Sequence, residues 1–343
     1  MRVGYFLILV LSLTCTCHCR WITSSEDLPN VEKIDSVENH AKINNLTPQQ
    51  AHDATIVPEY GDNIMYSGYV EVNSKTGSSI YFSFYESQTG NPEDVPLVLW
   101  LQGGPGSSSM FGDLVEIGPQ KLVTDTSGSR TEPRQETWNQ KYNLLFIDQP
   151  IGVGYSYVAQ GDSFVTSQDQ MKKDLYLTLQ TFFKAYPKYQ SCDFVIFGES
   201  FAGHYVPIIT NYILQQNETA DLKLNLKGMA IGDGLTDLKQ QLTTYAMFAF
   251  ANGLIDEKQY TIIKNLQTQN LQAIEKGQWT EANNIVVELQ GKITSWAGNV
   301  NIYNYRLFGE YSDPLTPFLN SADQKKMRHV PESVTYASSS GPA

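Results

Sequence analysis

Apolar positions along the chain fall into short runs separated by stretches with helical periodicity. Four runs are short and continuously apolar, as in strands buried on both faces of a sheet. They are Val95 to Leu101, Leu144 to Ile147, Phe194 to Phe197 and Met229 to Ile231. Between the second and third runs, apolar residues recur at helical spacing, with Ser167 as the expected N-cap and Pro187 as the stop. Strands that alternate with helices predict an α/β fold with a mainly parallel sheet and helices on both faces.

Two segments depart from this alternation. Residues 66–86 alternate apolar and polar positions on either side of Asn73 to Gly77, which predicts a β-hairpin. Residues 242–310 are predicted to be a helical cap insertion, which either roofs a pocket or forms a layer without a ligand. Its clearest helix carries apolar residues at spacings of 3, 4, 3, 4 and 3, namely Trp279, Ala282, Val286, Leu289, Ile293 and Trp296.

The pattern divides the rest of the chain as well. In residues 1–19, Arg2 precedes the apolar run Tyr5 to Leu11 and then small residues, which predicts a signal peptide cleaved near Cys19 and a secreted or lysosomal protein. Residues 20–57 are polar and are expected to form a loosely packed N-terminal extension. Residues 58–241 are the predicted core, and residues 311–343 are a truncated return to that core.

Charge and cysteine content exclude several classes of protein. Lys and Arg number 24 against 36 Asp and Glu, a net charge of −12 without a basic run, so a nucleic-acid partner is not expected. Beyond the N-terminus no apolar stretch approaches the length of a membrane span. Only Cys192 of the 4 cysteines lies outside the signal, so no internal disulfide, metal or cofactor is expected. Asn45 and Asn217 begin glycosylation sequons.

The strongest chemical signal follows the third apolar run. There a buried strand leads into Gly198-Glu199-Ser200-Phe201-Ala202-Gly203 and then into a helical pattern. This arrangement is typical of the nucleophile elbow of α/β-hydrolases, with Ser200 at the sharp turn. The backbone N–H of Phe201, at the helix start, is then placed to face an oxyanion.

A second glycine-rich segment, Gln102 to Ser109, follows the first apolar run. Glycines let the backbone approach a substrate closely, so Gly104 is the candidate for a second oxyanion donor, and a purely structural turn is the alternative. A phosphate-binding loop is disfavoured because no Lys follows the glycines.

Four blocks together resemble the serine carboxypeptidases, particularly the vitellogenic carboxypeptidase-like branch. The blocks are Leu99 to Ser109, Asn143 to Ser156, Gly198 to Tyr205 and Gly228 to Gly234, within a resemblance that covers about Pro58 to Pro331. It implies an α/β-hydrolase fold and a serine-type carboxypeptidase that removes the C-terminal residue of a peptide through an acyl-enzyme. The implied partner is therefore a peptide or protein with a free C-terminus, and the oligomeric state is left open.

The resemblance assigns roles residue by residue. Ser200 matches the nucleophile, and Gly104 and Phe201 match the oxyanion hole. The residues that match the binding site for the substrate carboxylate are Trp100, Gln102 and Glu199. Three positions depart from the usual family residues: Gln102 and Asp233 stand in place of Asn, and Ser107 in place of Cys.

Glu199 is the acidic member of the three residues that match the binding site for the substrate carboxylate. Two carboxylates cannot both be ionised at contact distance in a partly dry pocket, so Glu199 is expected to share a proton with the substrate carboxylate. The sequence therefore predicts acidic working conditions. The pairing of Gln102 with Glu199 also favours a peptide carboxylate over the alkyl group of an ester, which argues against an esterase, lipase or acyltransferase on the same fold.

The general base is not evident in the sequence. Of the histidines downstream of Ser200, His204 is expected to pack near the elbow, and His329 lies in a segment that resembles one whose His is not catalytic. The resemblance implies that the strand bearing the triad Asp and the turn bearing the triad His come later than Ala343, so the sheet is expected to lack its C-terminal part. The alternative function is a catalytically inactive secreted binding protein of the same fold.

Overall fold

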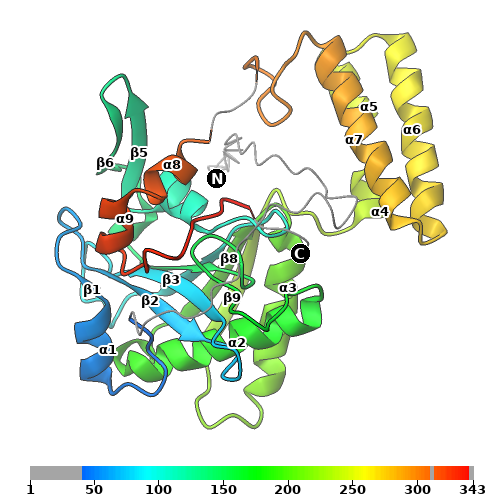
Figure 1. Ribbon diagram of the computed structural model, residues 1–343. Helices are drawn as coiled ribbons and strands as arrows, with labels where there is room; N and C mark the ends of the chain where they lie inside the picture. Colours follow the sequence, from blue (N-terminus) through cyan, green and yellow to red (C-terminus); the bar gives the residue numbers. More distant parts are fainter. Residues whose placement is uncertain (1–40, 310–312, 340–343) are drawn as a thin grey trace, which may run out of the picture. The chain divides into compact units, whose positions relative to one another are not determined.

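The computed structural model describes residues 41–309 and 313–339 (Figure 1). These residues form two compact units, of which the smaller contains residues 237–309. The larger unit contains a seven-stranded sheet in the order β1-β2-β3-β7-β4-β8-β9. Its strands are β1 (Ile56–Val57), β2 (Met65–Glu71), β3 (Ser79–Tyr85), β4 (Leu97–Leu101), β7 (Asn143–Asp148), β8 (Phe194–Glu199) and β9 (Leu226–Gly232).

Strand directions follow the sequence pattern closely. The predicted hairpin at 66–86 is confirmed as the antiparallel pair β2 and β3. The four apolar runs are confirmed as β4, β7, β8 and β9, which pair in parallel. Strand β3 joins the two parts by pairing antiparallel with β7. The carboxyl ends of the parallel strands therefore meet at one edge of the sheet, where sites of α/β proteins are found.

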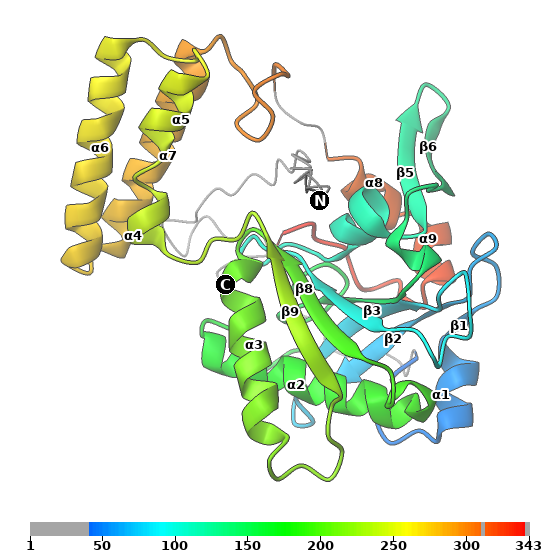
Figure 2. The same cartoon turned by 180° about the vertical axis from the view of Figure 1, so that it is seen from behind.

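Helices cover both faces of the sheet. Helices α1 (Pro48–Thr55), α2 (Gln168–Ala185) and α3 (Ala202–Gln216) lie on one face, and α8 (Leu315–Leu319) and α9 (Ala322–Met327) lie on the other (Figures 1 and 2). Helix α2 begins as predicted, because the Ser167 side chain accepts a hydrogen bond from the Gln170 N–H. Its predicted apolar stripe is buried against the sheet, as shown by Met171, Leu175, Leu179 and Phe182.

The expectation of a loosely packed extension is wrong for residues 41–57. Thr47 and Gln50 form a capping box that starts α1, and Ala51 and Ile43 are fully or almost fully buried. Lys42 also forms a 3.0 Å ion pair with Glu71 of β2. The few apolar side chains of this polar segment are enough to attach it to the sheet because a local cap fixes the helix that carries them.

A loop between β4 and β7 contains elements that the sequence pattern did not predict. It begins with a π-helix, η1 (Gly112–Ile117), followed by a hairpin of β5 (Gln120–Asp125) and β6 (Gly128–Pro133) and by η2 (Trp138–Gln140). The hairpin is mostly exposed, and ion pairs of Arg130 with Asp125 and Glu132 lie along it. Its exposed strands lack the alternating apolar face by which strands are recognised.

The smaller unit is helical, as predicted. It comprises α4 (Leu238–Gln241), α5 (Tyr245–Ala251), α6 (Glu257–Glu275) and α7 (Trp279–Trp296). Of the predicted stripe on α7, Ala282, Leu289 and Ile293 are buried, whereas Trp279 is 65% exposed. Throughout the described ranges, no helix combines the length and the apolar character needed to cross a bilayer.

Two fully buried carboxyl groups predict that the fold is more stable at mildly acidic than at neutral pH. Burial raises the pKa of Asp113 and of Asp148 from 3.8 to about 6. The folded chain therefore binds these protons more tightly than the unfolded chain, and the stabilisation is lost as pH rises from about 4 through 6. We expect the free energy of unfolding in urea to fall by about 2–4 kcal/mol between pH 4.5 and 7.5.

A variant pair tests this assignment. Asp148→Asn should reduce the slope of unfolding free energy against pH by about half, because Asp113 still contributes. Asp125→Asn should leave it unchanged, because exposed Asp125 has a pKa of about 2 and stays ionised over this range. A stability that rises from pH 4.5 to 7.5 in the unmodified chain would contradict the account.

Candidate active site

Ser200 occupies a sharp turn between β8 and α3. Its φ of 57° lies in the left-handed region, which is strained for a residue with a side chain. Two backbone hydrogen bonds hold the turn, from the Ser200 N–H to the Gly232 carbonyl at 3.1 Å and from the Leu235 N–H to the Ser200 carbonyl at 2.8 Å. Gly198 allows the close approach of α3, since a Cβ there would lie 2.6 Å from the Ala202 Cβ. This is the geometry expected of a nucleophile elbow.

The glycine-rich loop after β4 lies directly against this turn. A Cβ added to Gly103 would be 2.5 Å from the Phe201 nitrogen and 2.6 Å from the Glu199 carbonyl oxygen. Gly104 has a φ of 109°, which favours glycine. The loop that carries the Gly104 N–H is thus beside the Phe201 N–H, as an oxyanion hole built from these two groups requires.

A chain of hydrogen bonds orients the predicted carboxylate-binding residues. The Trp100 indole N–H donates to Gln102 Oε1 at 2.9 Å, and Gln102 Nε2 donates to Glu199 Oε2 at 3.3 Å. Trp100 and Gln102 are both buried. The indole fixes the oxygen of the amide, so its NH₂ group must face the side of the site on which Glu199 lies. The structure therefore brings the side chains of Trp100 and Gln102 together with Glu199, the residue that precedes Ser200.

Glu116 is a member of this cluster that the sequence analysis missed. It lies on η1, and its Oε2 atom is buried without a hydrogen-bond partner among the described residues. Burial raises the pKa of Glu116 well above its usual range, the carboxyls of Glu199 and Asp233 raise it further, and Arg134 lowers it. Glu116 therefore keeps its proton to a higher pH than an ordinary glutamic acid does, and the proton can be shared with Glu199. The sequence offered no sign of this contact, because it joins η1 to a distant strand.

Asp233 adds a third carboxyl group after β9. Burial and the charge of Glu199 raise the pKa of Asp233 to about 6. Its backbone has a φ of 38°, in the turn whose carbonyl at Gly232 supports Ser200. Three carboxyl groups at one site cannot all be ionised together at low cost, so this end of the sheet favours bound protons and acidic pH.

The Asp148 carboxyl supports the loop from the other side. It accepts hydrogen bonds from the Ser108 hydroxyl at 2.6 Å, the Ser109 N–H at 2.9 Å and the Tyr155 N–H at 2.9 Å. The Ser109 hydroxyl in turn accepts from the Gln102 N–H at 3.2 Å. A buried carboxyl at the end of β7 therefore fixes the backbone of a residue that faces the site.

Neither predicted downstream histidine is placed as a base for Ser200. The His204 ring packs on the Phe201 ring at a centroid distance of 4.8 Å, and burial lowers its pKa. His329 Nδ1 lies 3.1 Å from the Ser67 hydroxyl oxygen. Ser67 is on β2, four strand spacings or roughly 19 Å from β8 in the sheet order.

The remaining predicted positions have simple environments. Asn45 is exposed. The Asn217 side chain is engaged with the backbone of Leu224, donating to its carbonyl and accepting from its N–H. Cys192 is buried as a free thiol. Within residues 41–309 and 313–339, no group of three or more His, Cys, Asp or Glu is arranged to hold a metal ion.

Comparison with known proteins defines the class to which this fold and site belong. The sequence profile of the serine carboxypeptidases matches residues 58–339, and the chain belongs to that family. A probable serine carboxypeptidase CPVL of Dictyostelium discoideum is 37% identical over 276 residues, covering 78% of this chain and 54% of the relative. Its counterpart in Homo sapiens is 38% identical over 275 residues, covering 77% and 57%. The chain thus spans little more than half the length of these relatives.

The fold also matches a solved structure. The prohormone-processing carboxypeptidase Kex1 of Saccharomyces cerevisiae superposes with a TM-score of 0.72 over 87% of this chain and 72% of that one, at 24% identity. The α/β-hydrolase fold predicted from the sequence, with a mixed central sheet and flanking helices, is confirmed by this match.

Proposed function

We propose that the protein is a serine-type carboxypeptidase that releases the C-terminal residue of a peptide through an acyl-enzyme on Ser200. The observation that carries the proposal is the strained Ser200 turn beside the linked side chains of Gln102, Glu199 and Glu116. A nucleophile and a device for binding a terminal carboxylate within one site fit an exopeptidase better than an endopeptidase or an esterase.

The chemistry follows from these positions. The Ser200 oxygen bonds to the carbonyl carbon of the last peptide bond, and the negative charge that develops on the carbonyl oxygen is stabilised by the N–H groups of Gly104 and Phe201. The C–N bond then breaks, the released amine takes a proton, and water hydrolyses the ester. A base must accept the Ser200 proton, and neither His204 nor His329 occupies that position.

Recognition of the leaving residue depends on a shared proton. The Gln102 amide donates one hydrogen bond to the substrate carboxylate without adding a charge. A proton held between Glu116 and Glu199 lets these groups face a third carboxylate without repulsion. Above the pH at which this proton is lost, we expect binding and turnover to fall, so we propose an acidic compartment, reached by secretion or in the lysosome.

Covalent labelling tests the proposal. A fluorophosphonate probe reacts with an activated serine hydroxyl, and we expect one equivalent to attach at Ser200 and none in Ser200→Ala. Ser191→Ala, a change at an exposed serine, should keep full labelling. Binding of peptides with a free C-terminus but no labelling would replace the proposal with the alternative, an inactive binding protein of the same fold. That alternative is favoured by the placement of His204 on the Phe201 ring and of His329 beside Ser67.

A further inference from the structure

The π-helix η1 carries two acids, the fully buried Asp113 and the partly buried Glu116. Asp113 lies in its first turn, and Glu116 lies near its end and faces Glu199. A π-helix is rare and is often found at functional sites, because its wider turn displaces the side chains that follow. The position of Glu116 therefore depends on what holds each end of this single turn.

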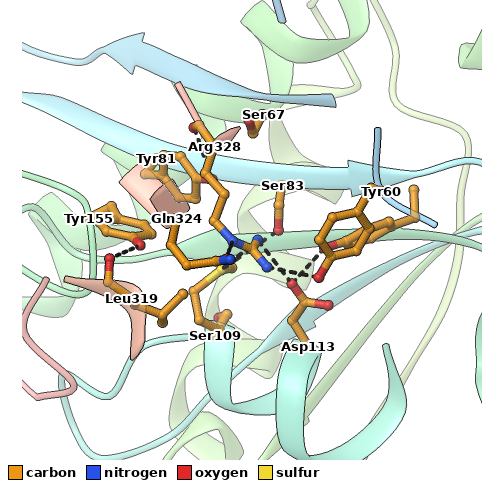
Figure 3. A network of polar contacts seen from close by, with 12 residues as sticks. Tyr60, Ser67, Tyr81, Ser83, Ser109, Asp113, Tyr155, Leu319, Gln324 and Arg328 are labelled. Atoms are coloured by element: carbon orange, nitrogen blue, oxygen red, sulfur yellow. Dashed lines mark hydrogen bonds and ion pairs between the residues drawn. The ribbon is translucent and has the colours of Figure 1, made fainter. Parts of the chain in front are cut away.

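The N-terminal end of η1 is held by side chains from distant parts of the chain. Asp113 Oδ2 accepts a hydrogen bond from the Tyr85 hydroxyl at 2.8 Å. The same atom lies 3.6 Å from Arg328 Nη1 (Figure 3). Arg328 is fully buried, and its Nη2 donates to the Tyr60 hydroxyl at 2.8 Å. These contacts fix Asp113 but do not reach Glu116.

The C-terminal end of η1 is held by Arg134, which directly follows β6. Its Nε donates to the Gly118 carbonyl at 3.1 Å, and its Nη2 donates to the Leu114 carbonyl at 3.0 Å. The Arg134 N–H also donates to the Pro119 carbonyl, which closes the base of the β5–β6 hairpin. One planar guanidinium thus joins carbonyls on both sides of Glu116, a geometry that a lysine cannot reproduce.

Resting on the proposed function, we propose that Arg134 is a positioning residue for the carboxylate subsite, whose guanidinium locks the last turn of η1 and so holds the Glu116 carboxyl against Glu199. Arg134 also places a positive charge near Glu116, opposing the carboxyls of Glu199 on β8 and Asp233 after β9. The charge of Arg134 favours ionisation of Glu116, and its two guanidinium hydrogen bonds fix the backbone of η1. The two contributions are separable by substitution.

The experiment measures affinity against pH in the full chain carrying Ser200→Ala, so that bound peptide is not consumed. The probe is an N-acetylated Phe-Leu dipeptide with a free carboxylate. Arg134→Gln removes both the positive charge and the paired guanidinium hydrogen bonds. We expect about tenfold weaker binding, because the Glu116 carboxyl is no longer held in place. We also expect the pH midpoint at which binding is lost to rise by about half a unit or more, because Glu116 keeps its proton to higher pH without the nearby cation. Arg134→Lys keeps the charge, so affinity should fall while the midpoint stays near its original value.

Arg130→Gln is the matched control, because Arg130 is an arginine of the same hairpin that contacts only exposed acids. It should change neither affinity nor midpoint. Circular dichroism shows whether each variant is folded. If Arg134→Gln does not fold, the affinity of Arg134→Lys for the peptide tests the positioning role. Unchanged affinity and midpoint in the folded Arg134 variants, or failure of both to fold, would overturn the positioning role. Loss of any preference for the free carboxylate over the amide in the parent chain would instead reject the proposed function.

Discussion

Arg328→Met is expected to lower the free energy of unfolding by about 3–5 kcal/mol at pH 7. The guanidinium is fully buried beside the Asp113 carboxyl, which is also fully buried, and its removal takes away the ion-pair partner of that carboxyl. Tyr60 loses a hydrogen bond and a ring contact at the same time. Urea unfolding measures the effect directly.

A second substitution separates the lost pair from lost packing. Asp113→Leu combined with Arg328→Met removes both charges, and we expect the double variant to recover most of the loss. The penalty of Arg328→Met alone should shrink at pH 5, because burial has already raised the pKa of Asp113 to about 6 and the uncompensated group takes up a proton. Arg130→Met, in an exposed pair, should cost far less than Arg328→Met. Equal costs at the two arginines would contradict the account.

Gly103→Ala is expected to slow fluorophosphonate labelling of Ser200 about 100-fold. The added Cβ would lie 2.5 Å from the Phe201 nitrogen and 2.6 Å from the Glu199 carbonyl oxygen, and both are backbone atoms that cannot turn aside. The elbow must therefore move away from the loop. We expect an additional loss of about 1–3 kcal/mol in stability from the crowding.

Gly228→Ala provides the matched control for this change. Gly228 lies on β9 of the same sheet, and a Cβ there meets no atom within 4 Å. Its labelling rate should equal that of the unmodified chain. A labelling rate in Gly103→Ala within twofold of the control would show that the loop does not constrain the elbow.

The sequence predicted the elements whose signals are local. Strand β8 and the turn at Ser200 were recognised because a continuous apolar run leads into small residues, and α2 because Ser167 and Pro187 mark its ends. The attachment of residues 41–57 was missed because three buried apolar side chains, Ile43, Ala51 and Val57, give no periodic signal in a polar segment. Helix η1 was missed because side chains from other segments stabilise it.

The site was predicted in part for the same reason. Gln102 and Glu199 were identified through motifs, and their hydrogen bond confirms that they lie together. Glu116 has no motif of its own in the sequence analysis, and its partners Glu199 and Arg134 come from β8 and from the end of the β5–β6 hairpin. Only the folded chain shows that these acids share a site.

The most direct test of the carboxylate site compares two ligands that differ in one group. N-acetyl-Phe-Leu and its C-terminal amide are titrated into the Ser200→Ala chain at pH 5 by isothermal calorimetry. We expect the free acid to bind at least about tenfold more tightly than the amide. Only the acid has a carboxylate that can accept hydrogen bonds from the Gln102 amide and from the proposed proton between Glu116 and Glu199. Glu199→Gln should therefore alter the ratio of the two affinities. Equal affinity for acid and amide would contradict a site built for a peptide C-terminus.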